Sequence, residues 1–301
     1  MSPVEAWGPR RWARNGAVRL AFDEFMPELG GEPLLVVTGL GVNRYWIPVG
    51  FCEQLAEHGF AVARYDHRDG GESTHLPPTA GRNPITALLA RRGEAYTAED
   101  MADDAIAVLD ELGWSSAHVL GVSLGGAVAQ RVALRHPDRV RSLTSVAAVP
   151  GDAAGLRTLR YIRLGTLAKF ARVKFPDTRE GAVDAGVAVV KLLSSPNREF
   201  DEAVVQARLE LDSYSGVHDQ EAQSRQIGAQ WSGPAITEIA RPTLVVHGED
   251  DPLIKPSTAH VIASRIPGSR LLLLPEAGHE LPENTWKPLA AAIRELADTN
   301  A

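Results

Sequence analysis

Cysteine is almost absent from this chain: Cys52 is the one cysteine among 301 residues. A disulfide bond within the chain is therefore impossible, as is usual for proteins of a reducing compartment. Long apolar runs are also missing, because no stretch approaches the roughly 18 residues of a membrane-spanning helix. Residues 1–15 carry charges and lack the apolar core of a secretory signal. We therefore predict a cytoplasmic protein without a membrane span.

The sequence also lacks the short motifs that hold metals and nucleotides. It contains no H-E-x-x-H, C-x-x-C or G-x-x-x-x-G-K-[ST] pattern. Its formal net charge of −7 argues against general binding to nucleic acid. We therefore expect no cofactor and no metal, and a small molecule rather than a nucleic acid as the partner. The sequence leaves the oligomeric state open.

Apolar segments alternate with helical patterns along most of the chain. Short apolar runs indicate strands, and segments with one apolar helical face that end at glycine indicate helices. We predict strands at residues 17–22 (an exposed edge strand), 33–38, 60–65, 117–120, 140–147, 243–247 and 270–274, and helices at 46–58, 98–112, 126–134 and 283–296. This alternation predicts an α/β fold, a mostly parallel twisted sheet flanked by helices.

The alternation stops after the strand that ends near Ala147 and resumes with the strand that starts near Thr243. Between them the helical periodicity continues without a convincing strand. The length of the chain suits one large α/β domain that carries an insertion. We therefore assign residues 1–150 and 235–301 to the core domain, and residues 151–234 to an inserted helical cap.

A serine pentapeptide, GVSLG at residues 121–125, joins a predicted strand to the following helix. An abrupt turn from strand to helix lifts the serine hydroxyl out of the sheet edge, where a substrate can reach it. Gly121 and Gly125 suit this nucleophile elbow, because the turn is strained and leaves no space for a Cβ beside the helix. The sequence therefore predicts that Ser123 is a nucleophile.

A serine hydroxyl is a good nucleophile only when a base removes its proton, and that base is normally a histidine held by a carboxylate. In enzymes with a nucleophile elbow of this kind, the chain order is serine, acid, histidine. His279 is the one histidine in a loop after the last predicted strand, so we predict it as the base. Asp251, in the loop after the strand at 243–247, is predicted as the acid, with Asp250 and Asp152 as rivals.

Two fixed backbone N–H groups are needed to bind the oxyanion that forms when a serine attacks a carbonyl carbon. One is predicted from Leu124, directly after the nucleophile. The other is predicted from Leu40, in the loop after the strand at 33–38. Gly39 and Gly41 flank it and let this loop fold close to the substrate oxygen.

Three blocks of sequence carry a resemblance to a known family. They are VVTGLG at residues 36–41, RYDHRDGGES at 64–73, and MADD at 101–104 leading into the serine pentapeptide. Together they resemble the α/β-hydrolase superfamily, in particular the branch that contains bacterial carboxylesterases, lipase-like hydrolases and the aclacinomycin methylesterases.

The resemblance covers about residues 17–297 and implies a core sheet, a helical cap and a Ser-His-Asp triad. These roles fall on Ser123, His279 and Asp251. Many members of the superfamily have His-Gly where this chain has Thr38 and Gly39. The esterase branch also lacks that histidine, so the departure does not imply a loss of activity.

These features predict a serine hydrolase that cleaves a carboxylic ester of an apolar small molecule through an acyl-enzyme intermediate. The same triad would also serve a carbon–carbon bond hydrolase or a cofactor-free perhydrolase or haloperoxidase. A non-catalytic ligand-binding protein on the same scaffold is disfavoured, because such proteins usually lose a triad member.

Overall fold

The computed structural model describes residues 7–77, 95–170, 178–212 and 222–299, apart from residues 27, 29 and 154, together with residue 172. The strands of this part are β1 (Arg11–Asn15), β2 (Val18–Phe25), β3 (Glu32–Val37), β4 (Phe60–Tyr65), β5 (Ala117–Val122), β6 (Val140–Val146), β7 (Thr243–Gly248) and β8 (Arg270–Leu274). They form one sheet in the order β1-β2-β4-β3-β5-β6-β7-β8. β2 pairs antiparallel with β1 and β4, and the pairs from β4 to β8 are parallel. The predicted mostly parallel sheet is confirmed.

Both faces of the sheet are buried. Alternate residues of a strand face opposite sides, so Leu35 and Val37 of β3 belong to one apolar cluster, and Leu34 and Val36 belong to the other. Strands covered on both sides are apolar at successive positions, which is why β3 lacks the polar alternation of an exposed strand.

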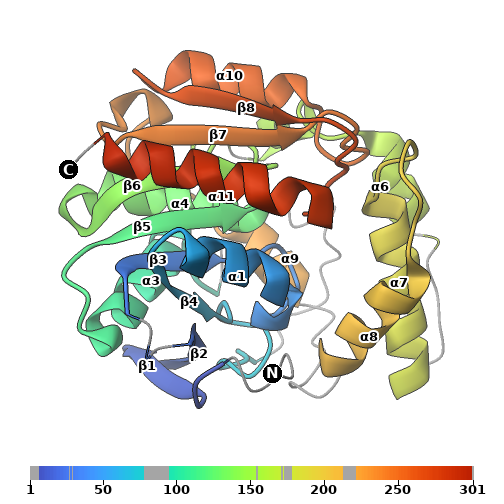
Figure 1. The fold of residues 1–301 in the computed structure, drawn as a ribbon, viewed down its shortest axis with the longest axis horizontal. Coiled ribbons are helices and arrows are strands. Elements are labelled where there is room, and N and C mark those ends of the chain that lie inside the picture. The colour runs from blue at the N-terminus through green and yellow to red at the C-terminus, as the bar shows by residue number, and fades with distance from the viewer. Residues whose placement is uncertain are drawn as a thin grey trace.

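Helices cover each face of this sheet. α3 (Ala98–Leu112), α4 (Leu124–Arg135) and α10 (Ser257–Arg265) contribute to the first cluster. α1 (Val49–Glu57) and α11 (Glu283–Asp298) contribute to the second and lie on the near side of the sheet in Figure 1. α3 begins at a capping box, in which Thr97 and Asp100 bond each other's backbone N–H, and it ends at Gly113 with φ 74°.

The chain between β6 and β7 forms helices α5 (Leu156–Leu159), α6 (Leu164–Phe170), α7 (Arg179–Leu193), α8 (Glu202–Asp212) and α9 (Ala222–Gly228). Figure 1 shows α6, α7 and α8 gathered at one end of the sheet. α7 packs against α8, and α8 packs against a short 3-10 helix, η2 (Arg44–Trp46). We call residues 151–234 the cap; its boundaries remain a prediction, and residues 154, 171, 173–177 and 213–221 lie outside the described part.

The edge of the sheet differs from the sequence prediction. The sequence predicts residues 17–22 as the edge strand, but residues 18–22 belong to β2, and β1 lies outside it. Gly16, at φ 59°, makes the turn that folds β1 back against β2. β1 has the sequence RWARN, with only Ala13 buried, so it carries no apolar run that sequence reasoning could find.

Candidate active site

Ser123 occupies the turn between β5 and α4, with φ 58° and ψ −118°. A positive φ is costly for a residue with a Cβ and persists only where the surroundings impose it. Glycine is required on both sides of this turn. A Cβ at Gly121 would lie 2.0 Å from the carbonyl oxygen of Gly125, and a Cβ at Gly125 would lie 2.1 Å from that of Val37. The strained turn that the pentapeptide predicts is therefore present at Ser123.

His279 connects Ser123 to Asp251 through its two ring nitrogens. Its Nε2 lies 2.9 Å from Ser123 Oγ, and its Nδ1 lies 2.7 Å from Asp251 Oδ2. The three residues follow β5, β7 and β8, so parallel strands deliver them to one edge of the sheet. His279 is 8% exposed and Asp251 is 1% exposed. The structure thus brings together the three residues that the sequence singles out separately.

Both oxygens of Asp251 accept hydrogen bonds. Oδ1 accepts from the backbone N–H groups of Leu253 and Ile254, each at 2.8 Å. Oδ2 accepts from His279 and faces the Nε2 of His247 at 3.1 Å. Burial alone raises the pKa of Asp251, but the charge of His279 and the bonds to both histidines lower it well below its ordinary value. Asp251 is therefore a carboxylate at neutral pH.

His247 is a part of this arrangement that the sequence reasoning missed. It lies at the end of β7 and is buried. Its Nε2 faces two oxygens, Asp251 Oδ2 and the carbonyl oxygen of Ile254 at 3.2 Å, so Nε2 must carry the proton. The available signal was its place four residues before the acid, at the end of an apolar strand.

His279 has a raised pKa. Burial lowers the pKa of its imidazole, but the charge of Asp251 and the hydrogen bond to it outweigh burial, and the net shift is upward. Asp251 also fixes the tautomer of neutral His279, because a carboxylate at Nδ1 requires a proton there. Nε2 then presents a lone pair to Ser123 Oγ.

The two rival acids have other partners. Asp250 Oδ2 accepts from Ser195 Oγ at 2.5 Å and from Asn197 Nδ2 at 3.0 Å. Asp152 forms an ion pair with Arg265, whose Nη1 lies 2.9 Å from Asp152 Oδ1. In the described part of the chain, neither carboxylate contacts His279.

The predicted oxyanion donors are placed beside the serine. Leu124 is the first residue of α4, directly after Ser123. Leu40 lies in the loop after β3, where a Cβ on Gly39 would lie 3.6 Å from Ser123 Cβ, an ordinary contact distance. Within the described residues, no hydrogen bond occupies the backbone N–H of Leu40 or Leu124. A backbone N–H without a protein acceptor is what an oxyanion donor requires, so the assignment of Leu40 and Leu124 stays a prediction.

The predicted oxyanion loop, residues 38–41, is held at both ends. The carbonyl oxygen of Thr38 accepts from His67 Nε2 at 3.0 Å. Burial lowers the pKa of His67 to about 4, so it acts as a neutral donor. At the other end, the N–H of Gly41 donates to Gln226 Oε1 at 3.0 Å, and Gln226 is a buried residue of α9. The last helix of the cap therefore bonds directly to the loop that presents Leu40.

Comparison with known proteins identifies the family. A family model described as the alpha/beta hydrolase fold matches residues 32–284. The chain belongs to the α/β-hydrolase family. Rhodomycin D methylesterase DnrP of Streptomyces peucetius is 30% identical to this chain over 308 residues, which span 95% of this chain and 97% of that protein. The enol-lactonase of Burkholderia xenovorans LB400 has a similar fold, with a TM-score of 0.69 at 21% identity over 96% of this chain and all of the other (100%).

A second methylesterase, rhodomycin D methylesterase DauP of Streptomyces sp. strain C5, is 30% identical to this α/β-hydrolase over 306 residues, which span 95% of this chain and 97% of that protein. The resemblance carried by the three sequence blocks, the fold class and the assignment to the hydrolases are thereby confirmed.

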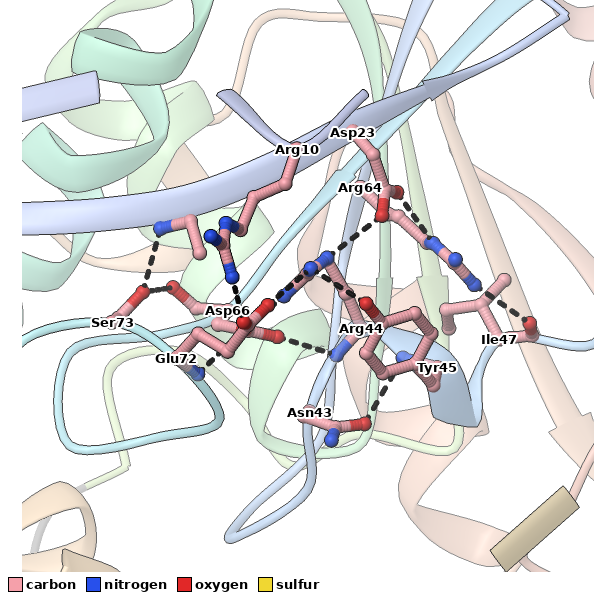
Figure 2. A network of polar contacts seen from close by, with 11 residues as sticks. Arg10, Asp23, Asn43, Arg44, Tyr45, Ile47, Arg64, Asp66, Glu72 and Ser73 are labelled. Carbon is pink, nitrogen blue, oxygen red and sulfur yellow. Dashed lines mark hydrogen bonds and ion pairs between the residues drawn. The ribbon is translucent and has the colours of Figure 1, made fainter. Parts of the chain in front are cut away.

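A network of largely buried ion pairs lies around Arg44, which follows the oxyanion loop in the sequence of this hydrolase (Figure 2). Arg44 is fully buried, and its backbone N–H and Nη1 donate to the two oxygens of Asp66, at 2.7 Å and 2.5 Å. Its Nε donates to Asp23 at 2.8 Å, and its Nη2 donates to Glu72 at 2.6 Å. Burial lowers the pKa of Arg44, but the charges of Asp66 and Asp23 raise it above its ordinary value. Ion pairs with Asp66 and Glu72 of the second resemblance block, and with Asp23 of β2, thus anchor Arg44 in the chain beyond the oxyanion loop.

Three further observations concern the part of this hydrolase that the structure describes. No cluster of three or more His, Cys, Asp or Glu side chains there could hold a metal ion. Cys52 is fully buried, and burial raises the pKa of its thiol to about 12, so a thiolate nucleophile is not available at neutral pH. No described helix is both long and apolar enough to span a bilayer.

Proposed function

We propose that this chain is a serine carboxylesterase that cleaves a carboxylic ester of an apolar small molecule through an acyl-enzyme intermediate. The observation that carries the proposal is the unbroken path of hydrogen bonds from Ser123 Oγ through His279 to Asp251. Ser123 Oγ attacks the ester carbonyl carbon while His279 Nε2 takes its proton. Asp251 holds the Nδ1–H tautomer and stabilises the imidazolium that forms.

The remaining steps use the same groups. The N–H groups of Leu40 and Leu124 bind the oxyanion of the tetrahedral intermediate. His279 then gives its proton to the leaving alkoxide oxygen, the alcohol departs, and the acyl group stays on Ser123. A water molecule, deprotonated by His279, attacks the acyl carbon and releases the acid and free Ser123.

A methyl ester is the form of substrate that we favour. DnrP and DauP are named as methylesterases of rhodomycin D and match nearly the whole of this chain. The cap bonds to the oxyanion loop through Gln226. This arrangement suits a substrate that is enclosed between the cap and the sheet. The alcohol released would then be methanol.

The direct test is hydrolysis of p-nitrophenyl esters from acetate to palmitate, beside rhodomycin D as a methyl ester. We expect turnover of at least one chain length, and the optimum measures the acyl pocket. Inactivity of folded protein on every ester would refute the esterase proposal. Diketone cleavage would then favour a carbon–carbon hydrolase, and oxidation with peroxide plus acetate would favour a perhydrolase. Failure of a fluorophosphonate probe to label Ser123 would favour a binding protein.

The pH dependence of this activity follows from the raised pKa of His279. His279 must be neutral to accept the serine proton, so kcat/KM should fall as the pH decreases through that pKa. Because the shift is upward, we expect the midpoint above the ordinary histidine value of about 6.5. A kcat/KM profile measured from about pH 5 to about pH 9 gives the midpoint. A midpoint below the ordinary value would contradict the interaction with Asp251.

A further inference from the structure

The connection between α7 and α8, residues 193–198, contacts the loop that carries the triad histidine. The backbone N–H of His279 donates to the carbonyl oxygen of Leu193 at 2.7 Å. The residue before it, Gly278, approaches the same connection so closely that a Cβ there would lie 2.2 Å from this oxygen. The main chain of His279 therefore rests directly on the cap, without an intervening side chain.

The same connection contacts the loop that carries the acid. Ser195 Oγ and Asn197 Nδ2 both donate to Asp250 Oδ2, the carboxylate next to Asp251 in the chain. The backbone N–H of Asp250 donates to the carbonyl oxygen of Ala277 at 3.0 Å, which ties the acid loop to the histidine loop. Ser195 is 4% exposed and Asn197 is exposed, so the bond from Ser195 is the better shielded of the two.

A third contact holds the other side of the histidine. Arg198 Nη2 donates to Glu280 Oε1 at 2.6 Å, and Glu280 directly follows His279. The connection thus bonds to His279 itself, to the residue after it and to the residue before the acid, and it packs against the residue before His279. Irregular loops have few hydrogen bonds of their own, so contacts of this kind determine where their side chains point.

We propose that residues 193–198 of the cap are a positioning element for His279, an inference that rests on the proposed function. The imidazole must stay within hydrogen-bond distance of Ser123 and Asp251 at once, and a displacement of about 1 Å can lower a rate about 100-fold. The connection supplies this constraint from the cap side.

The substitutions Ser195→Ala and Asn197→Ala, made together, remove both side-chain donors to Asp250 without changing the net charge. We expect kcat on the best p-nitrophenyl ester to fall about 10-fold or more, with KM changed less than about twofold. The pKa in the kcat/KM profile should move down, because His279 loses part of the interaction with Asp251 that raises it.

The matched control is Ser232→Ala. Ser232 Oγ donates to Glu99 Oε1 at 2.7 Å, a contact between cap and core that involves no triad loop. This variant should keep the wild-type kcat and pKa. Wild-type kcat and pKa in the double variant, or a change in its KM alone, would overturn the positioning role.

NMR titration of His279, assigned with His279→Gln, makes the test independent of ester turnover. A lower pKa in the double variant supports the proposal, and an unchanged pKa overturns it. This readout remains even if the wild type hydrolyses no ester, an outcome that would refute the proposed function and not the positioning of His279.

A swap tests the same contact with side chains of nearly native size, in case the double variant does not fold. Asn197→Asp places a second carboxylate beside Asp250 and should lower kcat about 10-fold. Adding Asp250→Asn restores the hydrogen bond with reversed polarity, and kcat should return to within about threefold of wild type. If the second substitution restores nothing, the contact does not position the histidine.

Discussion

Ser123→Ala should lower kcat/KM for esters by about 10⁴-fold or more. The substitution removes the oxygen that lies 2.9 Å from His279 Nε2, and with it the covalent intermediate. The oxyanion donors at Leu40 and Leu124 remain, so a small residual rate above that of water is expected. The measurement is the rate of p-nitrophenyl ester hydrolysis by wild type and variant at equal concentrations of folded protein.

Folding can be separated from chemistry in this variant. Alanine at position 123 keeps the Cβ and the φ of 58°, so the strain of the turn and the thermal unfolding midpoint should change little. Ser264→Ala, on the exposed side of α10, is a matched control in which Oγ bonds only its own helix, and it should behave as wild type. Retained esterase activity in Ser123→Ala, or a fluorophosphonate adduct on another residue, would remove Ser123 from the mechanism.

The strained turn at Ser123, the predicted nucleophile, was readable from sequence because its structural requirements are local. The strand, the two glycines and the helix around Ser123 lie within a few residues, and each leaves a pattern of its own. His279 was readable for a topological reason: successive parallel strands end at the same edge of the sheet, so a loop after β8 returns to the loop after β5. Local pattern and strand order together give both positions.

The choice between Asp250 and Asp251 could not be read in the same way. The two carboxylates are neighbours in one turn, and their chemistry is identical. Asp251 Oδ1 accepts the N–H groups of Leu253 and Ile254, which directs the other oxygen inward to the histidine. Asp250 points instead to the cap, at Ser195. Adjacent side chains in a turn diverge, so the identity of the acid depends on backbone geometry that composition does not encode.

The residues of the cap that contact the site, Gln226 and Leu193, could not be predicted from the sequence for a related reason. Gln226 bonds to Gly41, 185 positions away in the sequence. The carbonyl oxygen of Leu193, in the cap, accepts from the backbone N–H of His279, in the core. Neither contact leaves a periodicity or a motif near the residue that makes it. These contacts arise only when the cap and the sheet are folded against each other.

Asp251→Asn should lower kcat about 10⁴-fold, although it changes one atom. The amide must place either oxygen or nitrogen at the Oδ1 position, where the N–H groups of Leu253 and Ile254 converge at 2.8 Å. Oxygen belongs there, because an NH₂ group would face two donors. The amide nitrogen is then forced to the Oδ2 position, opposite Nδ1 of His279, 2.7 Å away. His247 Nε2–H also faces this position, but it keeps the carbonyl oxygen of Ile254 as an acceptor, whereas the two backbone N–H groups have no other acceptor among the described residues to replace Oδ1.

An NH₂ group at that position donates to Nδ1, so neutral His279 must carry its proton on Nε2 instead. Nε2 then has no lone pair for the proton of Ser123, and the base is lost while the imidazole stays in place. Steady-state kcat and KM, with the unfolding midpoint of each variant, measure this effect.

The matched controls are the rival acids. Asp250→Asn keeps an oxygen acceptor for Ser195, and Asp152→Asn affects an ion pair with Arg265 that does not reach the triad. Both variants should retain kcat within about 10-fold of wild type. A loss of about 10⁴-fold in either control, with Asp251→Asn active, would transfer the role of the acid to that residue. Such a transfer would contradict the observed geometry, in which the backbone N–H groups of Leu253 and Ile254 fix the orientation of the side chain at position 251.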